Sequence, residues 1–212
     1  MTDDAPLFDD AFRAGLETLL AWRRDVRHFR ADPLPDGECD RLIAAASFAP
    51  SVGNAQPWRF VRVTSASLRE ELAGHVDAAS ARAAEAYYQP RAAAYRALKL
   101  HGLREAPEIL AVFSDEAPST GHGLGVATMP EMLRYSTVMA IHTLWLTARA
   151  RGIGLGWVSI LEPRAVAALL AVPEHWTLIA LLCLGYPERP SSEPELQRKG
   201  WQDREPVHVL ER

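Results

Sequence analysis

A chain of 212 residues has the length of one domain, or of one domain with an extension, and is long enough to bury a sizeable core. Apolar residues make up 48% and charged residues 24%, as in ordinary globular proteins, and the net charge of −4 argues against nucleic acid as a partner. The acidic start MTDDAPLFDD lacks the apolar core of a signal peptide, and no apolar run could span a bilayer, so we expect a cytoplasmic protein with no membrane partner.

Hydrophobic periodicity and turn residues predict helices mixed with strands. We expect helices over 9–22, 36–48, 66–89, 91–104, 130–151 and 163–170, and strands over 59–64, 108–114, 154–160 and 178–185. Asp9 or Asp10 would cap the first helix, and the segment 23–29 is a loop or an irregular strand. The count is about five strands without regular strand–helix–strand alternation, which favours an α+β fold.

Two segments indicate contact with a second chain. The helix 130–151 is apolar nearly all round, as a helix buried on most sides is, and a homodimer formed through it is a reasonable hypothesis. The tail 186–212 is rich in Pro and charge and has no strong period, so we expect it to wrap a neighbour. No domain boundary is visible between residues 1 and 212.

The sequence lacks the patterns of a metal or nucleotide-triphosphate site. Cys39 and Cys183 are far apart in apolar surroundings, which favours buried free thiols and a reducing compartment. No HExxH, CxxC or P-loop is present, and Gly121, Gly123 and Gly125 do not follow a strand onto a helix. We therefore expect no metal.

Four polar clusters could carry chemistry. Three arginines in Arg23-Arg24-Asp25-Val26-Arg27 can converge on one anion, although such a stretch taken alone is more often a solvated basic segment. The loop 49–58 offers Ser51, Asn54 and Gln56 to a polar ligand, or is an ordinary turn. The segment GLGWVSI has small residues that let a backbone approach a flat ligand, and the fourth cluster is GYP followed by KGWQDR.

In this order, the segments resemble the nitroreductase-like flavoprotein family over about residues 12–207. The resemblance is carried by RRDVRHF, PSVGNAQPW, GLGWVSI, LGYP and Arg204-Glu205-Pro206. A narrower match is to the BluB, or 5,6-dimethylbenzimidazole synthase, subgroup, which is similar in RRDVRHF, AYRALKLHGLREAP, MLRYSTVMAIHTLWLTARARGIGLGWVSI, LCLGYPERP and PELQRKGWQDR. Asp25, where ordinary members usually carry Ser or Thr, is the main marker, and Ser159 is the second.

The resemblance implies a fold and a flavin site. The fold would be a mostly antiparallel sheet of about five strands flanked by helices, in a single FMN-binding domain over 1–212, with 186–212 wrapping the partner of an intertwined homodimer. Ser51 and Asn54 would come from the partner, and Lys99 would face the pyrimidine edge of the flavin. The FMN phosphate would be held by Arg23, Arg24, Arg27 and Arg204. The residues expected at the flavin are Arg23, Arg24, Asp25, Val26, Arg27, Ser51, Asn54, Lys99, Trp157, Val158, Ser159 and Arg204.

The resemblance also implies a reaction. Reduced FMN would be substrate as well as ligand, and O2 would be the co-substrate in its fragmentation to dimethylbenzimidazole, the lower ligand of vitamin B12, and erythrose 4-phosphate. Asp25 would act as general base or orient a proton-bearing group, and the Ser159 hydroxyl would bond the flavin. NAD(P)H could supply electrons indirectly, through a separate flavin reductase.

Two other functions remain open. A conventional NAD(P)H-dependent nitroreductase, or a flavin or cob(II)yrinic acid a,c-diamide reductase, would keep FMN bound and cycle it. A flavin- or nucleotide-binding protein without catalysis would show no turnover. Residue by residue, an ion pair with Arg24 or Arg27 competes with the catalytic interpretation of Asp25, and a backbone hydrogen bond competes with that of Ser159.

Overall fold

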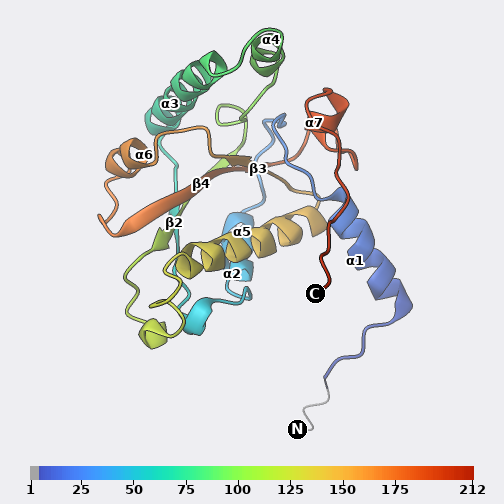
Figure 1. The fold of residues 1–212 in the computed structure, drawn as a ribbon, viewed down its shortest axis with the longest axis vertical. Helices are drawn as coiled ribbons and strands as arrows, with labels where there is room; N and C mark the ends of the chain where they lie inside the picture. The colour runs from blue at the N-terminus through green and yellow to red at the C-terminus, as the bar shows by residue number, and fades with distance from the viewer. Residues whose placement is uncertain (1–4) are drawn as a thin grey trace.

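The computed structural model describes residues 5–212, and its centre is a four-stranded antiparallel sheet. The strands are β1 (Trp58–Arg62), β2 (Glu108–Asp115), β3 (Gly154–Val158) and β4 (Trp176–Gly185), in the order β1-β2-β4-β3 (Figure 1). All three neighbouring pairs are antiparallel, which confirms the predicted α+β class and the antiparallel sheet.

The prediction of about five strands is wrong, because the described residues form a sheet of four. Segment 23–29 reaches the sheet through isolated bridges only, Asp25 to Leu155 and Phe29 to Pro187. The Asp25 carboxylate accepts the Trp157 amide of β3 at 2.8 Å, so a side chain takes an N–H that a longer backbone ladder would have used. The segment therefore lies along the edge of β3 without becoming a strand.

Seven α-helices and two short 3-10 turns surround the sheet in the described chain. They are α1 (Asp10–Trp22), α2 (Glu38–Ala46), η1 (Val52–Asn54), α3 (Ala66–Glu85), α4 (Arg91–Arg96), η2 (Gly121–Gly123), α5 (Met132–Ala150), α6 (Pro163–Leu169) and α7 (Glu195–Arg198). Asp9 caps α1 by accepting the Phe12 amide at 2.8 Å. None of these helices is both long and apolar enough to cross a membrane.

One predicted helix is wrong in its length. The basic segment 91–104 is helical only to Arg96, and 97–105 is a loop. Tertiary contacts fix the loop, because Arg27 Nη1 donates to the Lys99 carbonyl at 3.3 Å. Gly102 passes so close to Phe29 that a β-carbon there would lie 2.5 Å from the ring. These contacts override the helical preference of the segment, which Gly102 interrupts.

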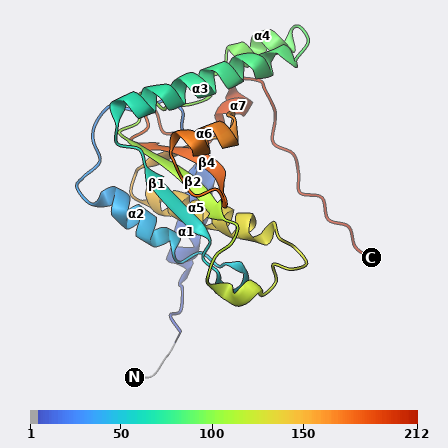
Figure 2. The ribbon, with the colours of Figure 1, turned by 90° about the vertical axis from the view of Figure 1, so that its left-hand side faces the viewer.

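The sheet is the middle of three layers (Figures 1 and 2). Alternate residues of β2 point to opposite faces, so Ile109, Ala111 and Phe113 pack with α3 and α6, while Leu110 and Val112 pack with α2 and α5. The strand β2 is almost entirely buried, as expected for a central strand, and both cysteines are buried free thiols, as predicted.

Three surfaces of the single chain leave apolar residues exposed. The helix α1 has no buried residue and projects from one edge of the molecule (Figure 1). Tyr135 and Val138 of α5 are also exposed, so the helix predicted to be buried on most sides is only partly covered within one chain. Beyond α7, residues 202–212 form no helix or strand and run away from the body of the molecule (Figure 2).

Candidate functional site

A cavity of about 290 Å³ lies between the segment 22–28, the C-terminal half of α5 and the segment 187–199. Arg24, Asp25, Val26 and Arg27, all predicted from sequence, line it. The predicted residue Lys99 does not line this cavity: its backbone carbonyl accepts Arg27 Nη1 at 3.3 Å, and Lys99 lines a second cavity of about 270 Å³.

Asp25 is tied to β3 and to an arginine at the same time. Its Oδ1 accepts the Trp157 N–H at 2.8 Å, and its Oδ2 accepts Arg27 Nε at 2.9 Å. Burial raises the pKa of the Asp25 carboxyl above its ordinary value, against the opposing effects of the Trp157 amide and Arg27. The ion pair considered for Asp25 is therefore present with Arg27, and the raised pKa makes the carboxylate a stronger base than an exposed one.

Cations crowd one side of the cavity. The pKa of Arg24 is lowered, first by burial and then by the charges of Arg23 and Arg204. Arg24 Nε donates to the Ser192 carbonyl at 2.7 Å, and the Arg23 guanidinium lies 4.6 Å from the centre of the Trp145 ring. The structure thus brings Arg204, from the exposed tail, within electrostatic range of Arg24, and a bound anion would relieve this repulsion.

The glycines of β3 let the segment 23–29 lie directly against the strand. A β-carbon at Gly156 would lie 2.1 Å from the Val26 carbonyl oxygen, and one at Gly154 would lie 2.8 Å from a Val26 methyl group. The Val26 amide donates to the Leu155 carbonyl at 3.0 Å. Backbone contact at this distance requires glycine at residue 156.

The end of β3 carries three of the predicted residues in different environments. Trp157 is half-buried and stacks on Trp145, with ring centres 6.4 Å apart. Val158 points into the core, so only its backbone is available to a ligand. Ser159 is exposed and follows the last strand residue, so it is not the strand serine that the sequence left open.

Ser51 and Asn54 lie elsewhere in the chain. The Val52 amide donates to Ser136 Oγ near the start of α5, at 3.0 Å, whereas the cavity lies near Arg149 at the other end of that helix. The stretch of α5 from Ser136 to Arg149 is about 20 Å long, at the usual helical rise. One chain therefore does not bring the loop of Ser51 and Asn54 to the arginines.

Sequence reasoning missed several residues of the cavity. Trp145 and Arg149 line it from one face of α5, at the i, i+4 spacing that places two side chains together on a helix and could have revealed them. Glu195 of α7 lies 3.4 Å from His28 Nε2, and its negative charge adds to the rise in the pKa of Asp25. Nothing in the sequence places α7 beside Asp25.

Comparison with known proteins identifies the family of the chain and relatives that are similar over nearly its whole length. The model of the nitroreductase family matches residues 20–186. A 5,6-dimethylbenzimidazole synthase of Rhodospirillum rubrum is 56% identical over 98% of both chains, and one of Rhodobacter capsulatus is 52% identical over 94% of this chain and 97% of its own. Among solved structures, an iodotyrosine deiodinase bound to FMN and 3-iodo-L-tyrosine is similar with a TM-score of 0.74 at 25% identity, covering 92% of this chain and 97% of that one.

Proposed function

The chain belongs to the nitroreductase family, and we propose that it acts as a 5,6-dimethylbenzimidazole synthase, converting reduced FMN and O2 into dimethylbenzimidazole and erythrose 4-phosphate. The observation that carries the proposal is the 56% identity, over 98% of both chains, to a relative of that name. It is supported by Asp25, a marker of that subgroup, which lines the cavity with a raised pKa.

The cavity has the chemistry that FMN needs. A phosphate monoester would be held by the crowded guanidinium groups of Arg23, Arg24 and Arg204, and its charge would relieve their mutual repulsion. Beside them, Trp145 lines the cavity and offers a flat aromatic surface, on which Trp157 of β3 stacks. The residues present thus fit an anionic group joined to a planar ring.

Reduced FMN, when bound, supplies the ring system that O2 oxidises and that is then broken. Asp25 would accept a proton from the ribityl carbon or a ring nitrogen, and Arg27 holds that carboxylate in place through its Nε. The Trp157 amide fixes the other carboxylate oxygen, so the group has one orientation. Ser159, exposed after β3, would donate its hydroxyl to the flavin.

Ser51 and Asn54 would enter the site from a second copy of the chain. Their distance from the arginines within one chain, the exposed face of α1 and the apolar side chains of Val207, Val209 and Leu210 in the exposed tail all support an intertwined homodimer. The segment 186–212 would then wrap the partner.

We expect light scattering to give the mass of two chains at micromolar concentration, and the mass of a single chain would contradict this arrangement.

Replacing Arg24 by Ala is expected to weaken FMN binding about tenfold to a hundredfold, because a charge-assisted hydrogen bond contributes about 1.5–3 kcal/mol. Flavin fluorescence titration measures the dissociation constant. Riboflavin, which lacks the phosphate, should bind wild type and variant equally. Arg30→Ala is the matched control, since Arg30 is exposed and pairs with Asp32 at 2.8 Å. An equal loss of affinity for FMN and for riboflavin would show that Arg24 does not bind the phosphate.

The proposed activity is tested by supplying purified protein with reduced FMN and O2 and measuring dimethylbenzimidazole by liquid chromatography. A chain that binds FMN tightly and oxidises NAD(P)H without forming dimethylbenzimidazole would overturn the proposal. In the cell, a separate flavin reductase using NAD(P)H would deliver the reduced flavin. The two buried free thiols support a reducing compartment such as the cytoplasm for the reaction.

A further inference from the structure

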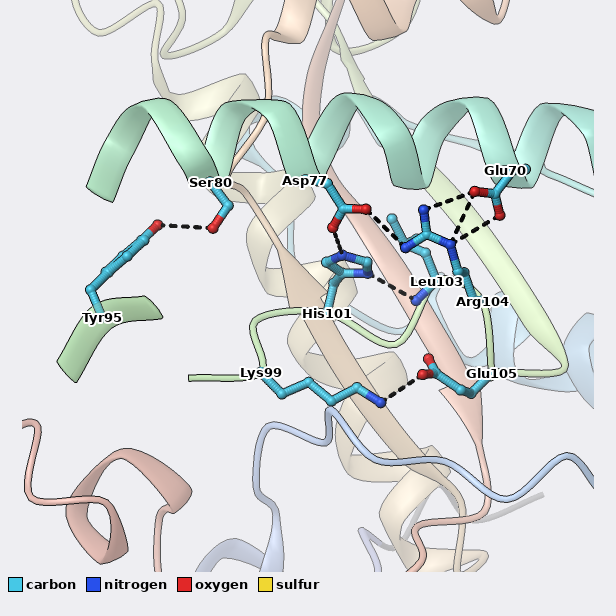
Figure 3. Close-up of polar contacts among 9 residues, drawn as sticks. All are labelled: Glu70, Asp77, Ser80, Tyr95, Lys99, His101, Leu103, Arg104 and Glu105. Atoms are coloured by element: carbon cyan, nitrogen blue, oxygen red, sulfur yellow. Dashed lines mark hydrogen bonds and ion pairs between the residues drawn. The ribbon is translucent and has the colours of Figure 1, made fainter. Parts of the chain in front are cut away.

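An aromatic cluster joins the start of the C-terminal tail to α3 and α4. Tyr87 and Tyr95 stack with ring centres 5.1 Å apart, and the Trp201 ring centre lies 5.6 Å from that of Tyr87 and 6.0 Å from that of Tyr95. Tyr95 is buried, and Figure 3 shows its side chain reaching Ser80 of α3, whose hydroxyl donates to the Tyr95 hydroxyl at 3.5 Å. The cluster therefore has a fixed base in the body of the domain, and Trp201 is the member that comes from the tail.

Arg91, the first residue of α4, holds Trp201 in two ways. Its guanidinium carbon lies 3.9 Å from the centre of the Trp201 ring, and its Nη2 donates to the Trp201 carbonyl at 2.8 Å. The face of an indole attracts a cation more strongly than that of any other aromatic side chain, and the hydrogen bond fixes the backbone as well as the ring. Both residues are half-buried, so solvent screens this contact less than it screens a fully exposed pair.

This Arg91–Trp201 contact lies directly beyond the part of the tail that borders the candidate flavin cavity. Arg198 and Lys199 line that cavity. The chain then turns at Gly200, whose φ of +66° favours glycine, and the Trp201 amide donates back to the Leu196 carbonyl at 2.8 Å. The turn and the Arg91–Trp201 contact together fix the point at which the chain leaves α7.

Arg204 follows Trp201 by three residues, a span of at most about 10 Å in an extended chain. Residues 202–212 form neither helix nor strand, so the path toward Arg204 starts from the position of Trp201. Arg24 Nε donates to the Ser192 carbonyl of the same tail at 2.7 Å, and Arg204 lies within electrostatic range of Arg24. A fixed Trp201 thus keeps two guanidinium groups near each other although they repel.

We propose that Arg91 and Trp201 are positioning residues for the phosphate of FMN. They act by holding Arg204 beside Arg24, and this role rests on the proposed function, in which both arginines bind that phosphate. Without the Arg91–Trp201 contact, two repelling cations would move apart, and phosphate binding would have to bring them together again. With it, their arrangement belongs to the folded chain, so less conformational entropy is lost when the phosphate binds.

The test is Arg91→Ala, with the dissociation constants of oxidised FMN and of riboflavin measured by flavin fluorescence. We expect FMN to bind about three- to tenfold more weakly, because the tail is loosened, whereas riboflavin, which has no phosphate, binds as it does to wild type. Arg91→Lys should recover part of the FMN affinity, since lysine also interacts with the face of an indole. Trp201→Ala should reproduce the selective loss, and it replaces Arg91→Ala if that variant does not fold.

Two further variants identify the route of the effect. In an Arg204→Ala background, Arg91→Ala should cause no further loss of FMN affinity, because the group that it positions is gone. Arg96→Ala removes an exposed arginine from the other end of α4, and it should leave both affinities unchanged. An equal loss for FMN and riboflavin in Arg91→Ala, or an undiminished loss in the Arg204→Ala background, would show that Arg91 supports the fold only and would overturn the positioning role. So would an Arg204→Ala variant that binds FMN as tightly as wild type.

The outcomes separate the positioning role from the proposed function. Wild-type protein that forms dimethylbenzimidazole, with unchanged FMN affinity in Arg91→Ala and Trp201→Ala, overturns the positioning role alone. A selective loss of FMN affinity in these variants, with wild-type protein that forms no dimethylbenzimidazole, overturns the proposed activity and supports the positioning role. Wild-type protein that binds FMN no more tightly than riboflavin overturns the phosphate site and the positioning role together.

Discussion

Replacing Asp25 by Asn is expected to lower the rate of dimethylbenzimidazole formation by about 10²- to 10⁴-fold, the usual contribution of a general base. Asparagine keeps an oxygen that can accept the Trp157 amide, and Arg27 keeps its bond to the Lys99 carbonyl. The segment 23–29 therefore stays on β3, and the dissociation constant of FMN should change by less than about threefold. Rates are measured by product formation, and affinity by fluorescence.

The pH dependence of the wild-type rate tests the same residue independently. The base must be unprotonated, so activity is lost as the pH falls through the pKa of Asp25. Because burial raises that pKa, the acid limb of the profile should lie above about 4, the ordinary value for Asp. The residual activity of Asp25→Asn should lack this limb. Two results would show that Asp25 has a structural role only. One is loss of FMN binding in the variant, and the other is an acid limb of the wild-type pH–rate profile at or below about pH 4.

The fold was largely predictable because its elements have strong local patterns. The continuous apolar run of β2 and the capped amphipathic helix α1 are both evident in the amino-acid sequence alone. The two errors lie where tertiary contacts override such patterns. Segment 23–29 pairs with β3 through the Asp25 side chain, and loop 97–105 takes its shape from Arg27, Phe29 and α3.

The candidate site was predictable in composition but not in arrangement. The resemblance indicated Asp25, Arg24 and Lys99, and the structure places Asp25 and Arg24 at one cavity and Lys99 at another. The segments of α5 and α7 belong to the resemblance, but it assigned no role to Trp145 or Glu195, so neither was expected there. The loop of Ser51 lies about 20 Å away along α5, so a single chain does not place it at the arginines, and its contribution depends on the proposed homodimer.

The close contact between β3 and the segment 23–29 explains why a glycine is needed in the strand. At residue 156 the nearest atom to an added β-carbon is a backbone oxygen, that of Val26, at 2.1 Å. At residue 154 the nearest atoms belong to the Val26 side chain, at 2.8 Å and beyond, and a side chain can turn away at small cost. The two glycines thus differ in what an added methyl group would displace.

Gly156→Ala is therefore expected to destabilise the protein by about 2–4 kcal/mol, while Gly154→Ala costs less than half as much. The methyl group at 156 can be accommodated only if the Val26 backbone moves away from β3, which also draws Asp25 away from the Trp157 amide. FMN affinity should fall more than about tenfold in Gly156→Ala, and the acid limb of any remaining activity should move toward the ordinary carboxyl range as Asp25 becomes exposed. Urea unfolding and flavin titration measure these effects. Equal losses of stability and of FMN affinity in the two variants would show that the position of the Val26 backbone does not depend on the glycine at 156.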